Sequence, residues 1–166
     1  MILPFHKIKA DDINLTDVNI IAQHDEYEGF NCSILDTDKL LENNSFLKWL
    51  YSKYKFTAAI LQIDPYMHFI WHKDAKRGVT INSMLSDGKS HTLFSDDVDN
   101  AAYQATILPL PYIKDKLFLF NTQVSHCVFN FNKKRQMFSV EFETSFNDGL
   151  TYNDVLKTIK EEYYSQ

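Results

Sequence analysis

Glycine, proline and cysteine are all scarce in this chain of 166 residues, which contains four Gly, four Pro and two Cys. No Pro-, Gly- or Ser-rich linker divides the chain, and its glycine content excludes a collagen. The composition, 45% hydrophobic and 23% charged, is that of a globular protein and excludes a disordered chain. Two cysteines, Cys32 and Cys127, are too few for a disulfide framework. We therefore expect two reduced thiols in a cytoplasmic protein.

Long hydrophobic runs and a basic charge balance are also missing. The longest apolar run, residues 117–120, is far too short to span a bilayer. The N-terminus has no long apolar core and no small-residue cleavage site, so we expect no signal peptide. Seventeen basic and 22 acidic side chains give a net charge of −5, which does not attract nucleic acid or an anionic membrane by bulk charge. We expect no nucleic-acid partner and no membrane partner.

Aromatic residues are abundant, with 13 Phe, 9 Tyr and 2 Trp. From residue 56 to about residue 143 they occur in short segments rich in β-branched residues, separated by polar, turn-like segments. This pattern predicts about eight strands in a mainly β sandwich or barrel. No helix-length segment lies between these strands, which argues against a parallel α/β fold.

Helices are expected on both sides of this β-rich centre. Apolar residues recur with helical spacing over residues 38–55, where Asp36 or Asp38 could cap the helix, and a strand is expected over residues 2–8. A second amphipathic helix begins after Thr151, which forms a possible capping box with Asp154. We expect one domain, residues 1–166, made of an N-terminal strand and helix extension (1–55), a β core (56–143) and a C-terminal helix (150–165).

The sequence Trp-His-Lys-Asp contains the most informative pair of polar residues. If this segment is a strand, His72 and Asp74 point to the same face, because residues two apart share a face. One histidine and one carboxylate are two thirds of the facial triad that holds non-haem Fe(II). His126 begins another predicted strand 54 residues later and could supply the third ligand, and Arg135 follows nine residues after it. A zinc site, or use of these residues without a metal, remains the alternative.

The stretch from about residue 56 to residue 143 resembles the 2-oxoglutarate- and Fe(II)-dependent oxygenases. It is most similar to the aspartyl/asparaginyl β-hydroxylase-like branch, including its short bacterial and phage versions. The resemblance covers about half of the chain and rests on two segments, IDPYMHFIWHKDAKRGVTINSML and KLFLFNTQVSHCVFNFNKKRQMFSVEF. It implies a double-stranded β-helix, also called a jelly roll or cupin-like barrel. It also implies catalytic iron bound by His72, Asp74 and His126.

The resemblance further implies that Arg135 pairs with the C5 carboxylate of 2-oxoglutarate. The chemistry is suitable, because the planar guanidinium binds a carboxylate through two parallel hydrogen bonds. Asn82 is the best candidate for a further cosubstrate contact, since an amide on a core-facing strand seldom stays unpaired. Ser139 shares a strand face with the arginine and could either contact the cosubstrate or simply pack. Many relatives have Ser or Thr two residues after the arginine, where this chain has Met137.

The implied activity is a dioxygenase that uses Fe(II), 2-oxoglutarate and O2 to hydroxylate a peptide, an amino acid or another small molecule, with release of succinate and CO2. Asp74 favours hydroxylation over halogenation, because halogenating members have Gly or Ala at that position. Residues 75–78, residues 86–100 and the N-terminal segment are expected to determine substrate specificity. Two alternatives stay open: a cupin-type metal protein or enzyme that does not use 2-oxoglutarate, and a non-catalytic β-sandwich binding or structural module.

Overall fold

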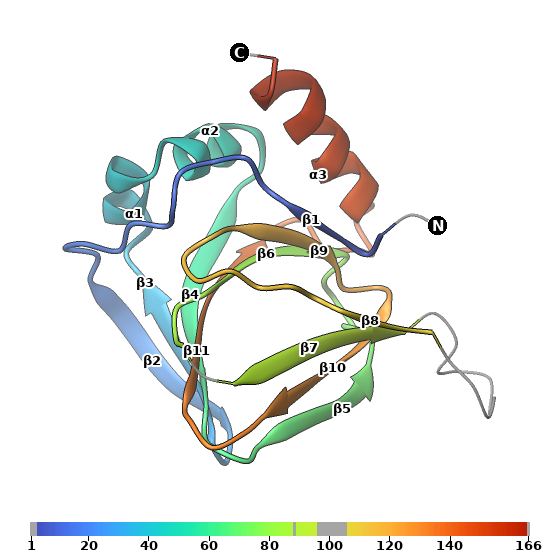
Figure 1. Cartoon of the computed structure of the whole chain (residues 1–166). Coiled ribbons are helices and arrows are strands. Elements are labelled where there is room, and N and C mark those ends of the chain that lie inside the picture. Colours follow the sequence, from blue (N-terminus) through green and yellow to red (C-terminus); the bar gives the residue numbers. More distant parts are fainter. Residues whose placement is uncertain (1–2, 88, 96–105, 166) are drawn as a thin grey trace.

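A computed structural model describes residues 3–87, 89–95 and 106–165. It contains two antiparallel sheets that face one another, with helices on the outer side of the larger sheet (Figure 1). The strand order is β1-β9-β6-β11-β4-β3-β2 in the seven-stranded sheet and β5-β10-β7-β8 in the four-stranded sheet. The fold is a mainly β, double-stranded β-helix, as expected from the sequence.

The strands of the large sheet are β1 (Phe5–Lys7), β2 (Ile20–Tyr27), β3 (Phe30–Leu35), β4 (Phe56–Ile63), β6 (Val79–Met84), β9 (Phe118–Asn121) and β11 (Arg135–Phe142). The small sheet contains β5 (His68–His72), β7 (Ser90–Ser95), β8 (Ile107–Pro109) and β10 (Ser125–Asn130). The eight strands from β4 to β11 confirm the pattern predicted for residues 56–143. Residues 96–105, which precede β8, lie outside the described residues.

The two faces of the large sheet bury different kinds of side chain. On β6 every residue is buried, but Val79 and Ile81 belong to the hydrophobic core, whereas Asn82 lines a cavity on the opposite face. This division follows from the two-residue period of a strand. The polar face is turned toward the small sheet, and the apolar face packs against the helices.

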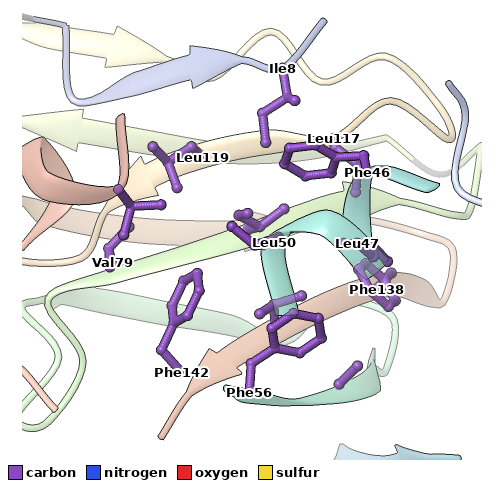
Figure 2. Packing of buried hydrophobic residues seen from close by; sticks show 14 of the residues in the cluster. Ile8, Phe46, Leu47, Leu50, Phe56, Val79, Leu117, Leu119, Phe138 and Phe142 are labelled. Carbon is purple, nitrogen blue, oxygen red and sulfur yellow. The ribbon is translucent and has the colours of Figure 1, made fainter. Parts of the chain in front are cut away.

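The larger of two hydrophobic core clusters among the described residues lies between the large sheet and the helices. Figure 2 shows side chains from the helical segment, such as Leu47 and Leu50, meeting Phe56 and Phe138 from the sheet. Leu47, Leu50 and Phe138 are completely buried. Burial of large apolar side chains contributes about 1.5–3 kcal/mol each, so this layer is the main source of stability.

The helix expected over residues 38–55 is two helices, α1 (Thr37–Asn43) and α2 (Ser45–Lys53), with an extended residue, Asn44, between them. The Asn44 side chain accepts a hydrogen bond from the Asn14 amide and donates to the carbonyls of Asn14 and Leu40. These bonds satisfy backbone groups exposed by the break, which the apolar periodicity does not reveal. Asp36 caps α1, in agreement with one of the two predicted caps.

The C-terminal helix forms as predicted. The helix α3 (Tyr152–Thr158) begins with the Thr151–Asp154 capping box and continues into a π-helical turn, η1 (Ile159–Tyr163). Buried Val155 and Ile159 attach it to the core. Within the described part of the chain, no helix is long and apolar enough to cross a membrane.

The hairpin of β2 and β3 is not predicted by the sequence analysis, which gives the N-terminal third only a strand and polar turns. The two strands pair from Ile20 opposite Leu35 to Tyr27 opposite Phe30, and β3 pairs with β4. The segment before residue 56 thus supplies three strands to the large sheet. β2 escapes detection because it is an exposed edge strand without regular apolar alternation.

Gly78 joins the loop after β5 to β6 and leaves no room for a side chain. A Cβ atom there would lie 2.4 Å from the Leu150 carbonyl oxygen and 2.9 Å from Cδ2 of Phe146. We expect Gly78→Ala to lower the free energy of unfolding by about 1–3 kcal/mol through overpacking, measured by urea denaturation. The exposed neighbour variant Lys76→Ala should change it by no more than about 0.5 kcal/mol. Equal stabilities of the two variants would contradict this account.

Candidate functional site

The structure brings His72, Asp74 and His126 together. β5 and β10 pair in antiparallel fashion, with His72 directly opposite His126. Their ring centroids are 4.3 Å apart, and Nε2 of each ring lies 3.7 Å from Oδ1 of Asp74. One nitrogen from each ring and one carboxylate oxygen lie within 4.8 Å of one another.

Both imidazole rings are oriented by the backbone. Nδ1 of His72 lies 2.7 Å from the Ile70 carbonyl, and Nδ1 of His126 lies 2.9 Å from the Val124 carbonyl. A carbonyl only accepts hydrogen bonds, so each Nδ1 carries a proton, and the Nε2 of each ring faces Asp74. Metal-binding histidines are held in this way by an outer partner.

Burial lowers the pKa of His126, and the neighbouring His72 lowers it further against the attraction of Asp74. Its ring is therefore neutral at neutral pH. At 3.7 Å neither histidine forms a hydrogen bond with the carboxylate. Two imidazole nitrogens and a carboxylate oxygen thus converge, and these are ligand atoms that fit a divalent cation.

Asp74 is held from two directions. Its amide donates to the Thr122 carbonyl at 3.1 Å, and its side chain is only 10% exposed. Arg77 Nη2 lies 2.7 Å from Asp74 Oδ2, although that oxygen accepts no well-aligned hydrogen bond from the described residues. Arg77 is thus an ion-pair partner of the candidate metal ligand Asp74.

The loop that carries Asp74 and Arg77 is fixed to the turn before β10. The Gln123 side-chain amide donates to the carbonyls of Asp74 and Arg77, at 2.8 and 2.7 Å. The hydroxyl of Thr122 also donates to the Arg77 carbonyl. The sequence analysis does not identify these two residues as supports, because their contacts are to backbone groups nearly 50 residues away.

A cavity of about 690 Å³ lies between the two sheets and contains all six predicted site residues in its wall: His72, Asp74, His126, Arg135, Asn82 and Ser139. Its size is typical of a small-molecule site. Apolar side chains form much of the remaining wall, including Leu61, Ile63, Phe69, Phe120 and Val128.

Arg135 is a buried cation in this wall, with 1% of its surface exposed. Its guanidinium donates to the hydroxyls of Ser90 and Thr92, the latter at 2.9 Å, and lies over the Tyr112 ring at 5.7 Å. No carboxylate of the described residues forms an ion pair with it, and its Nε has no hydrogen-bond partner. Burial lowers the pKa of Arg135, with Tyr112 acting in the opposite sense.

An arginine stays cationic in proteins, so this charge is buried without a counter-ion. A buried unpaired charge is costly, and the unused Nε donor adds to the cost. Both features fit an anionic ligand that enters the cavity. A dicarboxylate could place one carboxylate at Arg135 and its other end nearer the histidines.

Arg135 has three contacts that the sequence analysis does not identify: Ser90, Thr92 and Tyr112. Ser90 and Thr92 alternate with exposed His91 on β7, so strand periodicity could have placed them on the inner face. Tyr112 lies in an irregular segment and offers no such signal. Burial raises the pKa of Tyr112, opposed by Arg135 and by hydrogen bonding with Asn82 and Thr92, so its phenol stays protonated.

Asn82 and Ser139 lie opposite each other on β6 and β11. The hydroxyl of Thr80 donates to the Val140 carbonyl at 2.7 Å and lies 3.4 Å from the Ser139 hydroxyl and 3.3 Å from Asn82 Oδ1. These contacts make a polar floor in the cavity. Met137 lies between this floor and Arg135 on the same strand face, and its sulfur accepts from Arg135 at 3.4 Å.

The other histidines lie outside the cavity wall. His91 is exposed on the outer face of the small sheet and makes an edge contact with Phe131. His6 contacts the Tyr164 hydroxyl at 3.2 Å. His24 contacts Glu26 on β2.

No protein-family model matches the chain, and no curated protein matches its sequence. Solved structures match the fold. A prolyl-4-hydroxylase from Pseudomonas putida is 14% identical, with a TM-score of 0.51 over 70% of this chain and 72% of that chain. A prolyl hydroxylase from Trichoplax adhaerens, solved in complex with a peptide fragment of the hypoxia inducible factor oxygen degradation domain, is 16% identical, with a TM-score of 0.51 over 69% and 62%.

A third match is an oxidoreductase of the 2OG-Fe(II) oxygenase family from Burkholderia pseudomallei. It is 9% identical, with a TM-score of 0.50 over 73% of this chain and 70% of that chain. At such low identities these similarities establish the fold, the double-stranded β-helix, and leave the activity to be argued from the residues of the cavity.

Proposed function

We propose that the protein is a 2-oxoglutarate- and Fe(II)-dependent oxygenase that hydroxylates a peptide, an amino acid or another small molecule. His72, Asp74 and His126 would hold the iron, and Arg135 would bind the C5 carboxylate of 2-oxoglutarate. The observation that carries the proposal is the presence, in one cavity, of a converging His–Asp–His set and a buried arginine without a counter-ion. The fold shared with three solved oxygenases supports it.

When bound, Fe(II) with 2-oxoglutarate and O2 supplies the oxidising chemistry: one oxygen atom enters a C–H bond of the substrate, and the other enters succinate as CO2 leaves. His72, Asp74 and His126 would hold the metal through two imidazole nitrogens and one carboxylate oxygen. Arg135 holds the distal carboxylate through its guanidinium. Ser90, Thr92 and Tyr112 fix the position of that guanidinium.

The cavity wall also determines access of water. Phe94 and Phe120 pack around the His126 ring, with centroid distances of 5.8 and 5.7 Å, and His126 itself is 5% exposed. His72 is more open, with a side chain that is 39% exposed. Substrate would therefore approach from the His72 side. Asn82 and Ser139 would contact the cosubstrate from the polar floor.

The Trichoplax prolyl hydroxylase was solved with a bound peptide fragment. We therefore include a peptide among the substrates proposed for this protein. Of the segments expected to set specificity, residues 75, 77 and 92 line the cavity, as do Glu26 and Phe30 from the N-terminal segment. Residue 88 and residues 96–100 lie outside the described residues.

The first test is an anaerobic titration of the metal-free protein with Fe(II) and then with 2-oxoglutarate. We expect a visible metal-to-ligand charge-transfer band in the wild-type protein and none in His126→Ala. Arg135→Ala should form the band but require about 10- to 100-fold more 2-oxoglutarate, the equivalent of a charged hydrogen bond. Succinate formation without added substrate provides a second readout.

Two outcomes would contradict the proposal. Iron binding without a charge-transfer band would indicate a cupin-type metal protein that does not use 2-oxoglutarate. Absence of metal binding, with His126→Ala altering only stability, would indicate a non-catalytic binding or structural module.

Arg77 should act on the metal through Asp74. Removal of the guanidinium that lies 2.7 Å from Oδ2 frees the carboxylate to rotate. We expect Arg77→Ala to lower Fe(II) affinity about 10- to 100-fold, as is typical for loss of an outer partner of a ligand. The matched control is Lys76→Ala in the same loop. Unchanged Fe(II) affinity in both variants would mean that Asp74 is held by the backbone alone.

Arg135 should destabilise the ligand-free protein. Replacement by methionine removes a buried charge and an unused donor while keeping a similar apolar volume. We expect Arg135→Met to raise the free energy of unfolding by about 1–3 kcal/mol without cosubstrate, measured by urea denaturation. The control variant Arg135→Ala leaves a void and should not raise the free energy of unfolding. A less stable Arg135→Met protein would show that Ser90 and Thr92 already compensate the charge.

A further inference from the structure

A second group of possible metal ligands lies on the β2–β3 hairpin, outside the set at His72, Asp74 and His126. His24 and Cys32 are directly opposite each other in the antiparallel pair, so their side chains share a face. Glu26 lies two residues along β2, and its Oε1 is 3.3 Å from His24 Nε2. A nitrogen, an oxygen and the Cys32 sulfur lie within 4.8 Å of one another.

This face of the hairpin continues the inner face of the large sheet. Cys32 pairs with Leu61, and Leu61 pairs with Met137, two residues that line the cavity. Glu26 is itself part of the cavity wall. Figure 1 shows β2 at the edge of the large sheet, beyond β3 and β4. The three groups therefore adjoin the cavity at an edge where small ions have access, since His24 and Glu26 are exposed.

The electrostatic environment of Cys32 suits a bound cation. The residue is 7% exposed, and burial raises the pKa of its thiol. Glu26 and Glu141 raise it further, while Arg77 acts in the opposite sense. Without a cation the thiol therefore keeps its proton. A divalent cation would offset the two carboxylates and release that proton to solvent, as metal binding to cysteine requires.

We propose that His24, Glu26 and Cys32 form a second metal site, selective for Zn²⁺ or a similar borderline-soft divalent cation. Zinc takes imidazole nitrogen, carboxylate oxygen and thiolate sulfur, and a site with three protein ligands leaves its fourth position to water or another small ligand. With a neutral imidazole, one carboxylate and one thiolate, the occupied site has no net charge. The sulfur ligand separates it chemically from the His72–Asp74–His126 set, which contains none.

The test uses Co²⁺ as a spectroscopic substitute for Zn²⁺, added anaerobically to the reduced, metal-free protein. A thiolate-to-cobalt charge-transfer band in the near ultraviolet requires a cysteine ligand. We expect this band in the wild-type protein and in Cys127→Ser, with release of about one proton per ion at this site. The band should disappear in Cys32→Ser. Exposed His24 allows a variant that does not disturb the core: His24→Ala should weaken cobalt binding by more than about 100-fold, beyond the loss typical of an outer-shell partner.

The thiolate-to-cobalt band tests the hairpin site independently of the proposed oxygenase site. His126→Ala, which removes a ligand of that site, should keep the thiolate band. Absence of the band in the wild-type protein would overturn the second metal site, leaving His24 and Glu26 as a surface ion pair and Cys32 as a packed thiol. A band that persists in Cys32→Ser and disappears in Cys127→Ser would overturn it as well.

Discussion

The register between β5 and β10 is the constraint on which the cavity chemistry depends. It sets His72 opposite His126, and after a register shift between His126 and Val128 it sets Phe69 opposite Val128, both in the cavity wall. In both histidines the Nδ1 proton goes to the carbonyl two residues earlier. A one-residue slip would turn one ring to the outer face. Because backbone carbonyls accept the Nδ1 proton of both rings, the two Nε2 atoms converge on Asp74.

The large sheet separates stability from binding. Its outer face is apolar and packs under the helices, where residues such as Leu50 and Phe138 are fully buried. Its inner face has Arg135 and the Thr80–Asn82–Ser139 floor, polar groups whose burial contributes little to stability. Functional sites often retain such destabilising groups. The apolar layer offsets the cost of an arginine that has no counter-ion until a ligand arrives.

Strand periodicity accounts for what the sequence analysis predicts correctly. Alternation places Arg135, Met137 and Ser139 on one face, and the structure puts all three in the cavity wall. His72 and Asp74 converge as predicted, although Asp74 lies just beyond the end of β5 in a loop fixed by Gln123. His126, selected from its place at the start of a later strand, lies at the same point in the structure.

The features that the sequence analysis does not predict arise from interactions between distant segments. Asn44 divides the predicted helix because Asn14, 30 residues earlier, satisfies its side chain. Tyr112 reaches Arg135 from an irregular segment without a periodic signal. The polar composition of β2 is typical of a turn-rich segment. It is compatible with a strand because β2 pairs on one side only and lies at the sheet edge.

The β2–β3 hairpin extends the inner surface of the large sheet with two further strands. Among the described residues, two sets of possible metal ligands therefore lie on one surface. Their donors differ: two nitrogens and one oxygen in one set, and one nitrogen, one oxygen and one sulfur in the other. Most protein sites bind Zn²⁺ more tightly than Fe²⁺. A site that contains a thiolate would bind zinc first when zinc is limiting. Occupancy of the hairpin site would then leave the His72–Asp74–His126 set to Fe(II), so the two proposed sites would be linked by competition for metal rather than by contact.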